Sequence, residues 1–467
     1  MDYKKIGFKS GLEVHRQLDT NKLFCSCPSL VNDPNQADIN FKRILRTSQS
    51  ELGEVDKAAL HEFKKNKFFK YEATSHSSCL VEYDEEPPHN LNQEALRVAI
   101  QVAKTFNASV VDELQVMRKV VIDGSNVSSF QRTILVAING YIETSKGKVK
   151  IPLICLEEEA AKKVQTELTF TKYRLDRLGI PLLEITTDAS LQDPDHVKET
   201  ASLIGMALKS TGNVKGGIGS VRQDINLSIK GSSRIEIKGF QDLRVMPKVI
   251  INETNRLISL KESKPEVRKI NTDLTTEFLR PMPGSARMYP ETDIRPIKIT
   301  QSLLSSIKKP ELISDKVSSL EKKYNIDKNL AEELVKKEIN LDPYLKKYKN
   351  IESKKLIEIL INVPKEVKSR FKIKISQENL EQALTLLDQG KINIQYLVDV
   401  LNDLHNNKFD INKYKQVDLN EIEQDIKKIK QENKGASLNA LMGIVMKKYG
   451  GKVNPKDIAT LLKKEDE

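Results

Sequence analysis

Acidic residues recur beside apolar runs between residues 151 and 184, and they are the first side chains of this sequence that suggest chemistry. The segment IPLICLEEEAAKK carries three consecutive carboxylates directly after an apolar run, at Glu157, Glu158 and Glu159. Glu184 stands alone in the apolar segment GIPLLEI that follows. A carboxylate next to a hydrophobic core is costly unless it is paired, hydrogen-bonded or bound to a metal. The cluster therefore predicts partners elsewhere in the chain.

A helix start offers a second interpretation of these acids. Glu158 and Lys162 are four residues apart, as are Glu159 and Lys163, and such pairs stabilise a helix by about 0.2–0.5 kcal/mol each. Acidic residues in a first turn also interact favourably with the helix dipole. We therefore expect a helix to begin over residues 157–163, where Glu159 could be merely structural.

A strand that could supply partners lies near the N-terminus. The segment SGLEVHRQL, residues 10–18, alternates with a period of two, which is typical of a strand. Glu13 and His15 share one face, and Leu12 and Val14 share the other. Same-face neighbours lie about 7 Å apart, so the glutamate and the histidine could address one ion or one substrate. A half-solvated strand would produce the same alternation.

A second alternating segment, SVRQDINLSIKGSSRIEIKGF, predicts a hairpin with a charged face. Asp224 and Asn226 on that face are good hard-oxygen ligands for magnesium. Arg222, Glu236 and Lys238 share the face with them. A solvent-exposed face also explains such a pattern. No GxxxxGKS or GxxxxGKT is present, which excludes nucleotide binding of the P-loop kind.

Two closely spaced pairs of soft ligands suggest a structural metal site. Cys25 and Cys27 form a C-x-C pair, and His76 and Cys79 form an H-x-x-C pair. Together they could close a tetrahedral zinc site of three cysteines and one histidine, with no open position for catalysis. Simple buried cysteines are the alternative.

Charge and composition narrow the class of protein. The 467 residues carry 76 Lys and Arg against 65 Asp and Glu, a net charge of +11. This balance favours a polyanionic partner such as nucleic acid, although a lysine-rich proteome would give it too. Four cysteines do not make a disulfide framework. No uncharged apolar run approaches the roughly 20 residues of a membrane helix, and the N-terminus lacks a signal-peptide pattern, so we expect a cytoplasmic enzyme.

The predicted elements that position these residues are a mixture of helices and strands in the first part of the chain and helices alone in the second. Apolar stripes predict helices over residues 92–106, 193–211 and 246–260, between segments with strand and hairpin patterns. Four prolines in LRPMPGSARMYPETDIRPI forbid regular structure there. Arg280 and Arg287 in that stretch could clamp a phosphate or a carboxylate. From about residue 298 the chain becomes lysine-rich and helical in period.

Several motifs in order carry a family resemblance. GLEVH, LFCSCP, LEEEAAKK, RLGIPLLEI, RQDINLSI, EIKGFQDL and RPMPGSARMYPETDI resemble the B/E family of tRNA-dependent amidotransferase subunits, and within it the archaeal E type. The ending LNALMGIVMKKYGGKVNP resembles the tail domain of that family. The resemblance implies an α+β fold: a catalytic cradle domain with an antiparallel sheet at 1–297, a helical tRNA-binding domain at 298–385 and a helical tail at 386–467.

The resemblance also implies an activity. Members are ligases that convert glutamate esterified to tRNA(Gln) into glutamine. ATP phosphorylates the side-chain carboxylate, and ammonia then displaces phosphate from the acyl phosphate. The ammonia comes from an asparaginase-like glutaminase partner, which is of the D type in archaea, within a heterotetramer. We therefore expect ATP and magnesium as cofactors, together with the structural zinc suggested above.

The same resemblance assigns residues. The magnesium shell implied by similarity is Glu13, His15, Glu158 and Glu184. Glu157 and Asp224 complete the implied catalytic set. The implied contacts to ATP or substrate are Arg177, Arg222, Asn226, Glu236, Lys238 and Arg287.

The chain departs from the family pattern at three places. Archaeal members of the E type carry an inserted domain resembling one in aspartyl-tRNA synthetase after the helix that ends near Leu260, and only a short linker stands there in this sequence. Glu159 stands where members often have Asp, and His76 is atypical. A basic RNA-binding scaffold that has lost its chemistry is the competing hypothesis. The retained acids and His15 favour an active enzyme.

Overall fold

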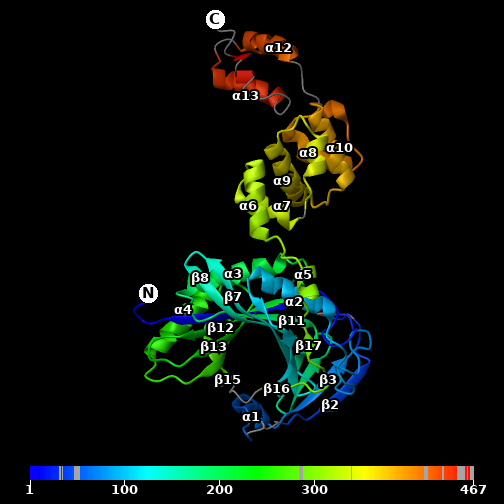
Figure 1. The fold of residues 1–467 in the computed structure, drawn as a ribbon. Coiled ribbons are helices and arrows are strands. Elements are labelled where there is room, and N and C mark those ends of the chain that lie inside the picture. The colour runs from blue at the N-terminus through cyan, green and yellow to red at the C-terminus, as the bar shows by residue number, and fades with distance from the viewer. Residues whose placement is uncertain are drawn as a thin grey trace. The chain divides into compact units, whose positions relative to one another are not determined.

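The structure, a computed structural model, divides the chain into two compact units, Met1–Ile313 and Ser314–Glu467. It describes all residues except 31–32, 34, 47–52, 218, 283–287, 338, 415–418, 434–435, 450–457, 460 and 463–467. Strands and helices make up the first unit and helices the second (Figure 1). The expected α+β class is confirmed. The expected domain boundaries after residues 297 and 385 stay predictions.

The main sheet of the first unit has eleven strands in the order β15-β14-β13-β12-β1-β11-β8-β7-β6-β16, with β4 paired to β7. Their bounds are β1 Lys9–Gln17, β4 Ser109–Val110, β6 Val116–Val120, β7 Phe130–Thr144, β8 Gly147–Glu158, β11 Pro181–Thr186, β12 Val221–Ser228, β13 Ile235–Phe240, β14 Glu266–Ile270, β15 Thr276–Pro281 and β16 Met288–Pro290. The β13–β14 pair is parallel. The other pairs of this sheet are antiparallel, in agreement with the predicted antiparallel sheet.

Three helices cover one face of this sheet and confirm the predicted apolar stripes. They are α2 (Gln93–Thr105), α3 (Pro194–Lys209) and α4 (Met246–Ser259), and they pack on β7, β8, β1 and β12. Leu12 and Val14 of β1 are fully buried in the core between sheet and helices. Because side chains alternate along a strand, Glu13 and His15 of β1 lie on the opposite, polar face. A short helix, α5 (Gln301–Ser306), closes this part of the chain.

A smaller sheet contradicts the helix expected over residues 157–163. Its order is β2-β3-β10-β9, with bounds β2 Ile39–Arg43, β3 Phe68–Ala73, β9 Lys162–Thr166 and β10 Phe170–Arg174. The chain stays extended because β8 pairs with β11 as far as Glu158, and β9 then pairs with β10. Ladder hydrogen bonds at every second residue outweigh two weak charge pairs.

Short strands and one further helix complete the first unit. Helix α1 spans Lys57–Phe63, and β5 (Glu113–Leu114) pairs with β17 (Ile297–Lys298). The proline-rich segment is less irregular than predicted, because β15 extends into it as far as Pro281 and β16 forms within it and ends at Pro290. A proline is tolerated at a strand end, where the missing N–H leaves the ladder intact.

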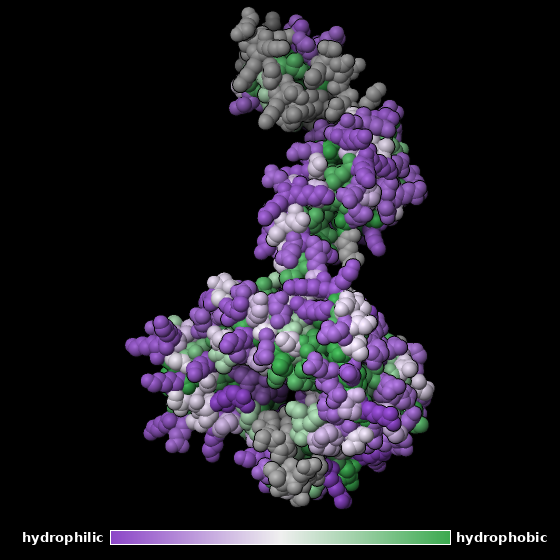
Figure 2. All heavy atoms as spheres, in the orientation of Figure 1, coloured by the Kyte–Doolittle hydropathy of each residue, from purple (hydrophilic) through white to green (hydrophobic). Residues whose placement is uncertain are grey.

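The second unit is helical, as the sequence predicted. Its helices are α6 Ile313–Tyr324, α7 Lys328–Lys336, α8 Asp342–Lys347, α9 Ser353–Phe371, α10 Gln377–Asp388, α11 Leu397–His405, α12 Leu419–Glu432 and α13 Leu438–Tyr449, with single 3-10 turns at Ile394–Tyr396 and Ile411–Lys413. Residues 422–462 carry a separate apolar cluster. Hydrophilic side chains cover most of the visible surface of α6 to α11 (Figure 2). Among the described residues, no helix has both the length and the apolarity to cross a bilayer.

Gly124, in the loop between β6 and β7, ties the two sheets together. Its carbonyl accepts a hydrogen bond from the Tyr71 hydroxyl at 2.8 Å. Its φ is +89°, and a Cβ there would lie 2.1 Å from Cδ1 of Phe69. Left-handed backbone disfavours any other residue, and the buried ring leaves no space for a methyl group.

We expect Gly124→Ala to lower the free energy of unfolding by about 3 kcal/mol, the sum of left-handed strain and overpacking. Gly231→Ala is the matched control, since Gly231 has a φ of +83° with nothing within 4 Å of the added Cβ. It should cost only about 1 kcal/mol. Urea unfolding measures both, and equal losses would show that contact with Phe69 does not restrict this position.

Candidate functional site

A cavity of about 470 Å³ opens on the polar face of the main sheet. Six carboxylates, five lysine or arginine side chains and His15 line it, and we call it the acidic cavity. Figure 2 shows hydrophilic residues in the visible hollow of this unit. The predicted residues that the structure brings together here are Glu13, His15, Glu157, Glu184, Arg222, Asp224, Asn226, Glu236 and Lys238.

The register of three strands builds the centre of this cavity. Strand β1 lies between β11 and β12, so that His15 is opposite Glu184 on one side and Arg222 on the other. Glu13 is opposite Asp224. The His15 Nε2 atom lies 3.3 Å from Glu184 Oε2. Residues far apart in sequence thus meet because antiparallel pairing aligns their side chains on one face.

Two overlapping groups of side chains could hold a metal ion. Glu13, His15 and Glu184 form one, and Glu13, Asp224 and Glu236 form the other, with ligand atoms within 4.8 Å of one another in each. Asn226 Nδ2 donates a 2.9 Å hydrogen bond to Glu13 Oε1 and orients the shared carboxylate. Carboxylate oxygens are the ligands that magnesium prefers.

Burial and neighbouring charges give the carboxylates of the cavity different pKa values. Burial, with the charges of Glu184 and Glu236, raises the pKa of Glu13 to about 7. Burial opposes ionisation of Asp224, yet the Lys238 ammonium, 2.8 Å from its Oδ2, brings its pKa down to about 2. Burial also opposes ionisation of Glu184, but Lys119 and His15 lower its pKa. The cavity therefore holds fixed anions beside one carboxyl that titrates near neutrality.

Hydrogen bonds to cations fix the remaining acids. Lys119 Nζ donates to Glu157 Oε1 at 2.5 Å and lies 3.8 Å from Glu184 Oε2. Arg222 Nη1 donates to both carboxylate oxygens of Glu159, at 2.9 and 3.0 Å. Glu159 is almost fully buried and does not line the cavity. It anchors the guanidinium that does, whereas the sequence predicted a pairing with Lys163 on a helix that the structure does not form over residues 157–163.

Glu158 is not brought together with the other predicted magnesium ligands. It follows Glu157 on β8 and therefore points to the opposite face of the sheet. There its Oε2 accepts a 3.1 Å hydrogen bond from the Arg132 backbone N–H, and its Oε1 lies 3.3 Å from Arg132 Nη1. Burial raises its pKa, and Arg132 opposes the rise. The geometry corrects the expectation that Glu158 shares an ion with Glu13 and Glu184.

One predicted arginine, Arg177, falls outside the acidic cavity. Arg177 donates from Nε to the Ala160 carbonyl at 2.9 Å and from Nη2 to the Ala161 carbonyl at 3.0 Å. It supports the turn after β8 and does not line the acidic cavity. Arg287 lies outside the described residues.

Sequence reasoning missed several cavity residues in and around the loop between β6 and β7. They are Lys119, Asp123, Ser125, Asn126 and Gln131. Gln131 Nε2 donates to Glu157 Oε2 at 3.2 Å and to the Glu158 carbonyl at 2.6 Å. The available signal was a lysine directly before two valines in MRKVV, close to the polar turn DGSN.

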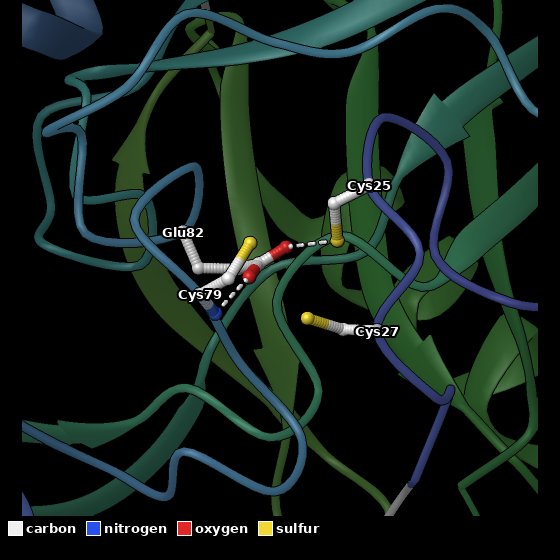
Figure 3. A group of neighbouring side chains, drawn as sticks. All are labelled: Cys25, Cys27, Cys79 and Glu82. Carbon is white, nitrogen blue, oxygen red and sulfur yellow. Dashed lines mark hydrogen bonds between the residues drawn. The ribbon is translucent and has the colours of Figure 1, made fainter.

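A second cluster combines three cysteines with a glutamate rather than a histidine. Cys25, Cys27, Cys79 and Glu82 place four ligand atoms within 4.8 Å of one another (Figure 3). Cys25 Sγ donates to Glu82 Oε1 at 3.0 Å, and the Cys79 backbone N–H donates to Glu82 Oε2 at 2.8 Å. The His76 side chain is 59% exposed and faces Asp33 instead. The predicted fourth ligand is therefore corrected from His76 to Glu82.

Comparisons with known proteins agree on one family. The family model described as the GatB/GatE catalytic domain matches residues 8–305, and the model described as the GatB domain matches residues 344–465. The E-type subunit of the glutamyl-tRNA(Gln) amidotransferase of Methanocaldococcus jannaschii is 33% identical over 625 positions, covering 100% of this chain and 99% of that protein. The same-named protein of Methanosarcina acetivorans is 32% identical over 626 positions, covering 99% and 98%.

Another relative with the same name, from Methanococcus maripaludis strain C7, is 51% identical over 278 residues, which are 59% of this chain and 44% of that protein. The two long alignments extend over more positions than this chain has residues. These relatives therefore carry additional chain that this sequence lacks, in agreement with the expected missing insert.

The raised pKa of Glu13 generates a prediction for the metal-free protein. Because its folded-state pKa of about 7 exceeds the ordinary 4.5, Glu13 contributes stability below pH 4.5 that is lost as the pH rises through about 7. Glu13→Gln keeps an acceptor for Asn226 and removes the charge. With a chelator present, we expect its thermal midpoint to exceed that of the wild type at pH 8 and to match it at pH 4.5.

The exposed Glu143 provides the control, since Glu143→Gln should follow the wild type at both values of pH. A lower midpoint for Glu13→Gln at pH 8 would contradict this account of the cavity.

Proposed function

The chain belongs to the GatB/GatE family, and from that premise we propose that it is the amidating subunit of an ATP-dependent glutamyl-tRNA(Gln) amidotransferase. In the proposed reaction the side-chain carboxylate of the tRNA-bound glutamate attacks the γ-phosphorus of ATP, and ADP leaves. Ammonia then attacks the carbonyl carbon of the acyl phosphate, inorganic phosphate leaves, and the ammonium proton passes to a base. The product is Gln-tRNA(Gln).

The observation that carries the proposal is the row of facing carboxylates on β11, β1 and β12. Phosphoryl transfer between two anionic groups requires their charges to be neutralised and held in line. Glu13, His15 and Glu184, with Asp224 and Glu236 beside them, would hold the magnesium that supplies this neutralisation. Glu158 is left out of this set because it lies on the other face of the sheet.

Cationic side chains around the row would bind the phosphates. Lys119, Arg222 and Lys238 line the acidic cavity, and each is already oriented by a carboxylate partner. A cation held in place by a hydrogen bond loses little freedom when an anion arrives. These three side chains would therefore contact ATP or the acyl phosphate, and Asn226 would keep Glu13 oriented.

Glu157 would serve the amidation half of the reaction. Its carboxylate lines the same cavity and is hydrogen-bonded to Lys119, Gln131 and the Thr133 hydroxyl. An anionic oxygen in this position would orient the arriving ammonia and accept the proton that the attacking nitrogen releases.

The proposal includes partners. No glutaminase motif was found in the sequence, so we expect an asparaginase-like glutaminase of the archaeal D type to supply ammonia, in a heterotetramer in the cytoplasm. Charged tRNA(Gln) would be held by lysine-rich helices in the regions 298–385 and 386–467. A basic RNA-binding scaffold without chemistry is the second candidate, favoured only by the net charge.

Amidation with free ammonium tests the enzyme proposal without the partner. The chain is mixed with Glu-tRNA(Gln), ATP, magnesium and an ammonium salt, and Gln-tRNA(Gln) is measured. We expect Glu184→Gln to lower kcat by at least about 100-fold while the Kd for tRNA stays unchanged, because this carboxylate lines the acidic cavity, whereas the proposed tRNA contacts come from lysine-rich helices elsewhere in the chain. Glu143→Gln, an exposed change elsewhere on the sheet, is the control.

Two results would contradict the proposal. Failure of the wild type to form Gln-tRNA(Gln), even with the glutaminase partner supplied, would favour the scaffold. Equal losses of turnover and tRNA binding in Glu184→Gln would give that residue a structural role.

We also propose that the cysteine cluster holds a structural zinc ion. Three sulfurs and one carboxylate oxygen form a donor set that zinc accepts in tetrahedral sites. The cluster joins the loop after β1 to the segment around residue 79, and neither segment has a regular element to hold it there. A metal would fix the two segments to each other.

Metal analysis of protein purified without chelator tests this site. We expect about one zinc per chain in the wild type, and a loss of zinc in Cys27→Ser because the site loses a thiolate. His76→Ala is the control and should keep its zinc, since His76 lies outside the cluster. A zinc content near zero in the wild type would exclude the site. Loss of zinc in His76→Ala would show that His76, and not Glu82, is the fourth ligand.

A further inference from the structure

A second cavity, of about 280 Å³, adjoins the acidic cavity. Asp123, Lys238 and Arg280 line both cavities, so the two spaces share a wall. The remaining lining of the second cavity comes from α1, β3, β9, β10 and β15 and the residues directly beside them. Of the residues predicted from the sequence to do chemistry, Lys238 and Arg280 belong to it.

The two cavities differ in charge. The second is lined by five lysine or arginine side chains and two carboxylates, whereas the acidic cavity has six carboxylates against five such cations. We call the second the basic cavity. Its own cations are Lys65, Lys67 and Lys163, and it shares Lys238 and Arg280. An excess of cations in a concave surface attracts phosphate more strongly than scattered surface lysines do.

Arg280 carries unused hydrogen-bonding capacity at the junction. Its Nε atom is buried and has no hydrogen-bond partner in the described part of the chain. A guanidinium offers five donors in a planar fork that matches a phosphate. A buried donor without a partner is costly, and an anion bound between the two cavities would relieve that cost.

The apolar wall of the basic cavity argues against recognition of a base. Phe69 and Tyr173 line it, but they are only 7% and 1% exposed. Rings this deeply packed offer no face for stacking, which is how single-stranded bases are usually bound. Lys163 Nζ lies 5.9 Å from the centroid of the Tyr173 ring. The cavity therefore suits a phosphate rather than a purine or pyrimidine.

We propose that the basic cavity binds a backbone phosphate at the 3′ end of the charged tRNA, an inference that rests on the proposed function. Two phosphate-bearing substrates must reach the same carboxylates. ATP arrives as its magnesium complex, and the carboxylate-rich cavity suits that complex. The tRNA backbone brings no ion of comparable charge, so the cation-rich cavity suits it. The glutamyl group is esterified to the terminal nucleotide, and a phosphate held in the adjoining basic cavity would bring that group to the acidic cavity.

Lys163 gives the cleanest test because it lines only the basic cavity and lies on the exposed edge strand β9. We expect Lys163→Gln to raise the KM for Glu-tRNA(Gln) about fivefold, with kcat and the KM for ATP unchanged. The logarithmic dependence of tRNA binding on salt should become less steep by about 0.7 for the lost contact. Lys162→Gln is the matched control. Lys162 is the neighbour of Lys163 in the sequence, and its side chain points to the other face of β9.

Arg280→Gln provides a second variant, and retention of labelled Glu-tRNA(Gln) on a filter provides a readout that needs no turnover. We expect weaker retention and a shallower salt dependence in both variants. A rise in the KM for ATP alone, unchanged KM values, or equal effects in Lys162→Gln would overturn the inference while the wild type still amidates. Absence of Gln-tRNA(Gln) in the wild type would instead refute the proposed function, and the filter assay would still report on the cavity.

Discussion

The rest of the site depends on one constraint. Several carboxylates lie close together on one face of the main sheet, where their like charges repel. The register of β11, β1 and β12 brings Glu184, Glu13 and Asp224 onto one surface, where repulsion and desolvation would otherwise protonate them. Lys119 and Lys238 keep two of them ionised, and the third titrates near neutrality. A divalent cation would complete this balance.

The opposite face of the same strands holds this arrangement in place. Leu12 and Val14 of β1 pack against helices in a continuous core, so the strands cannot slip by one residue without turning carboxylates into that core. The fixed register therefore brings the carboxylates close enough to repel one another. It also prevents the strands from shifting to separate them. Around it the molecule separates charge between two adjoining spaces, one rich in carboxylates and one rich in cations.

Period-two patterns were enough to predict β1 and the β12–β13 hairpin, and family motifs predicted five of the six carboxylates that line the cavity. Which face of β8 each acid occupies could not be predicted, because three consecutive glutamates carry no alternation. Glu157 enters the cavity, whereas Glu158 turns away to Arg132. Cysteine spacing likewise predicted three members of the metal cluster. The fourth depended on the turn after Cys79, which points Glu82 inward and leaves His76 exposed.

Transfer of oxygen from substrate to phosphate tests most directly whether this surface activates a carboxylate. Glu-tRNA(Gln) labelled with ¹⁸O in the side-chain carboxylate is converted with ATP and ammonium, and the inorganic phosphate is analysed by mass spectrometry. Formation of an acyl phosphate on the substrate predicts one labelled oxygen in each phosphate released with glutamine. Unlabelled phosphate alongside Gln-tRNA(Gln) would contradict the account, because ATP would then be cleaved without activating the glutamyl group.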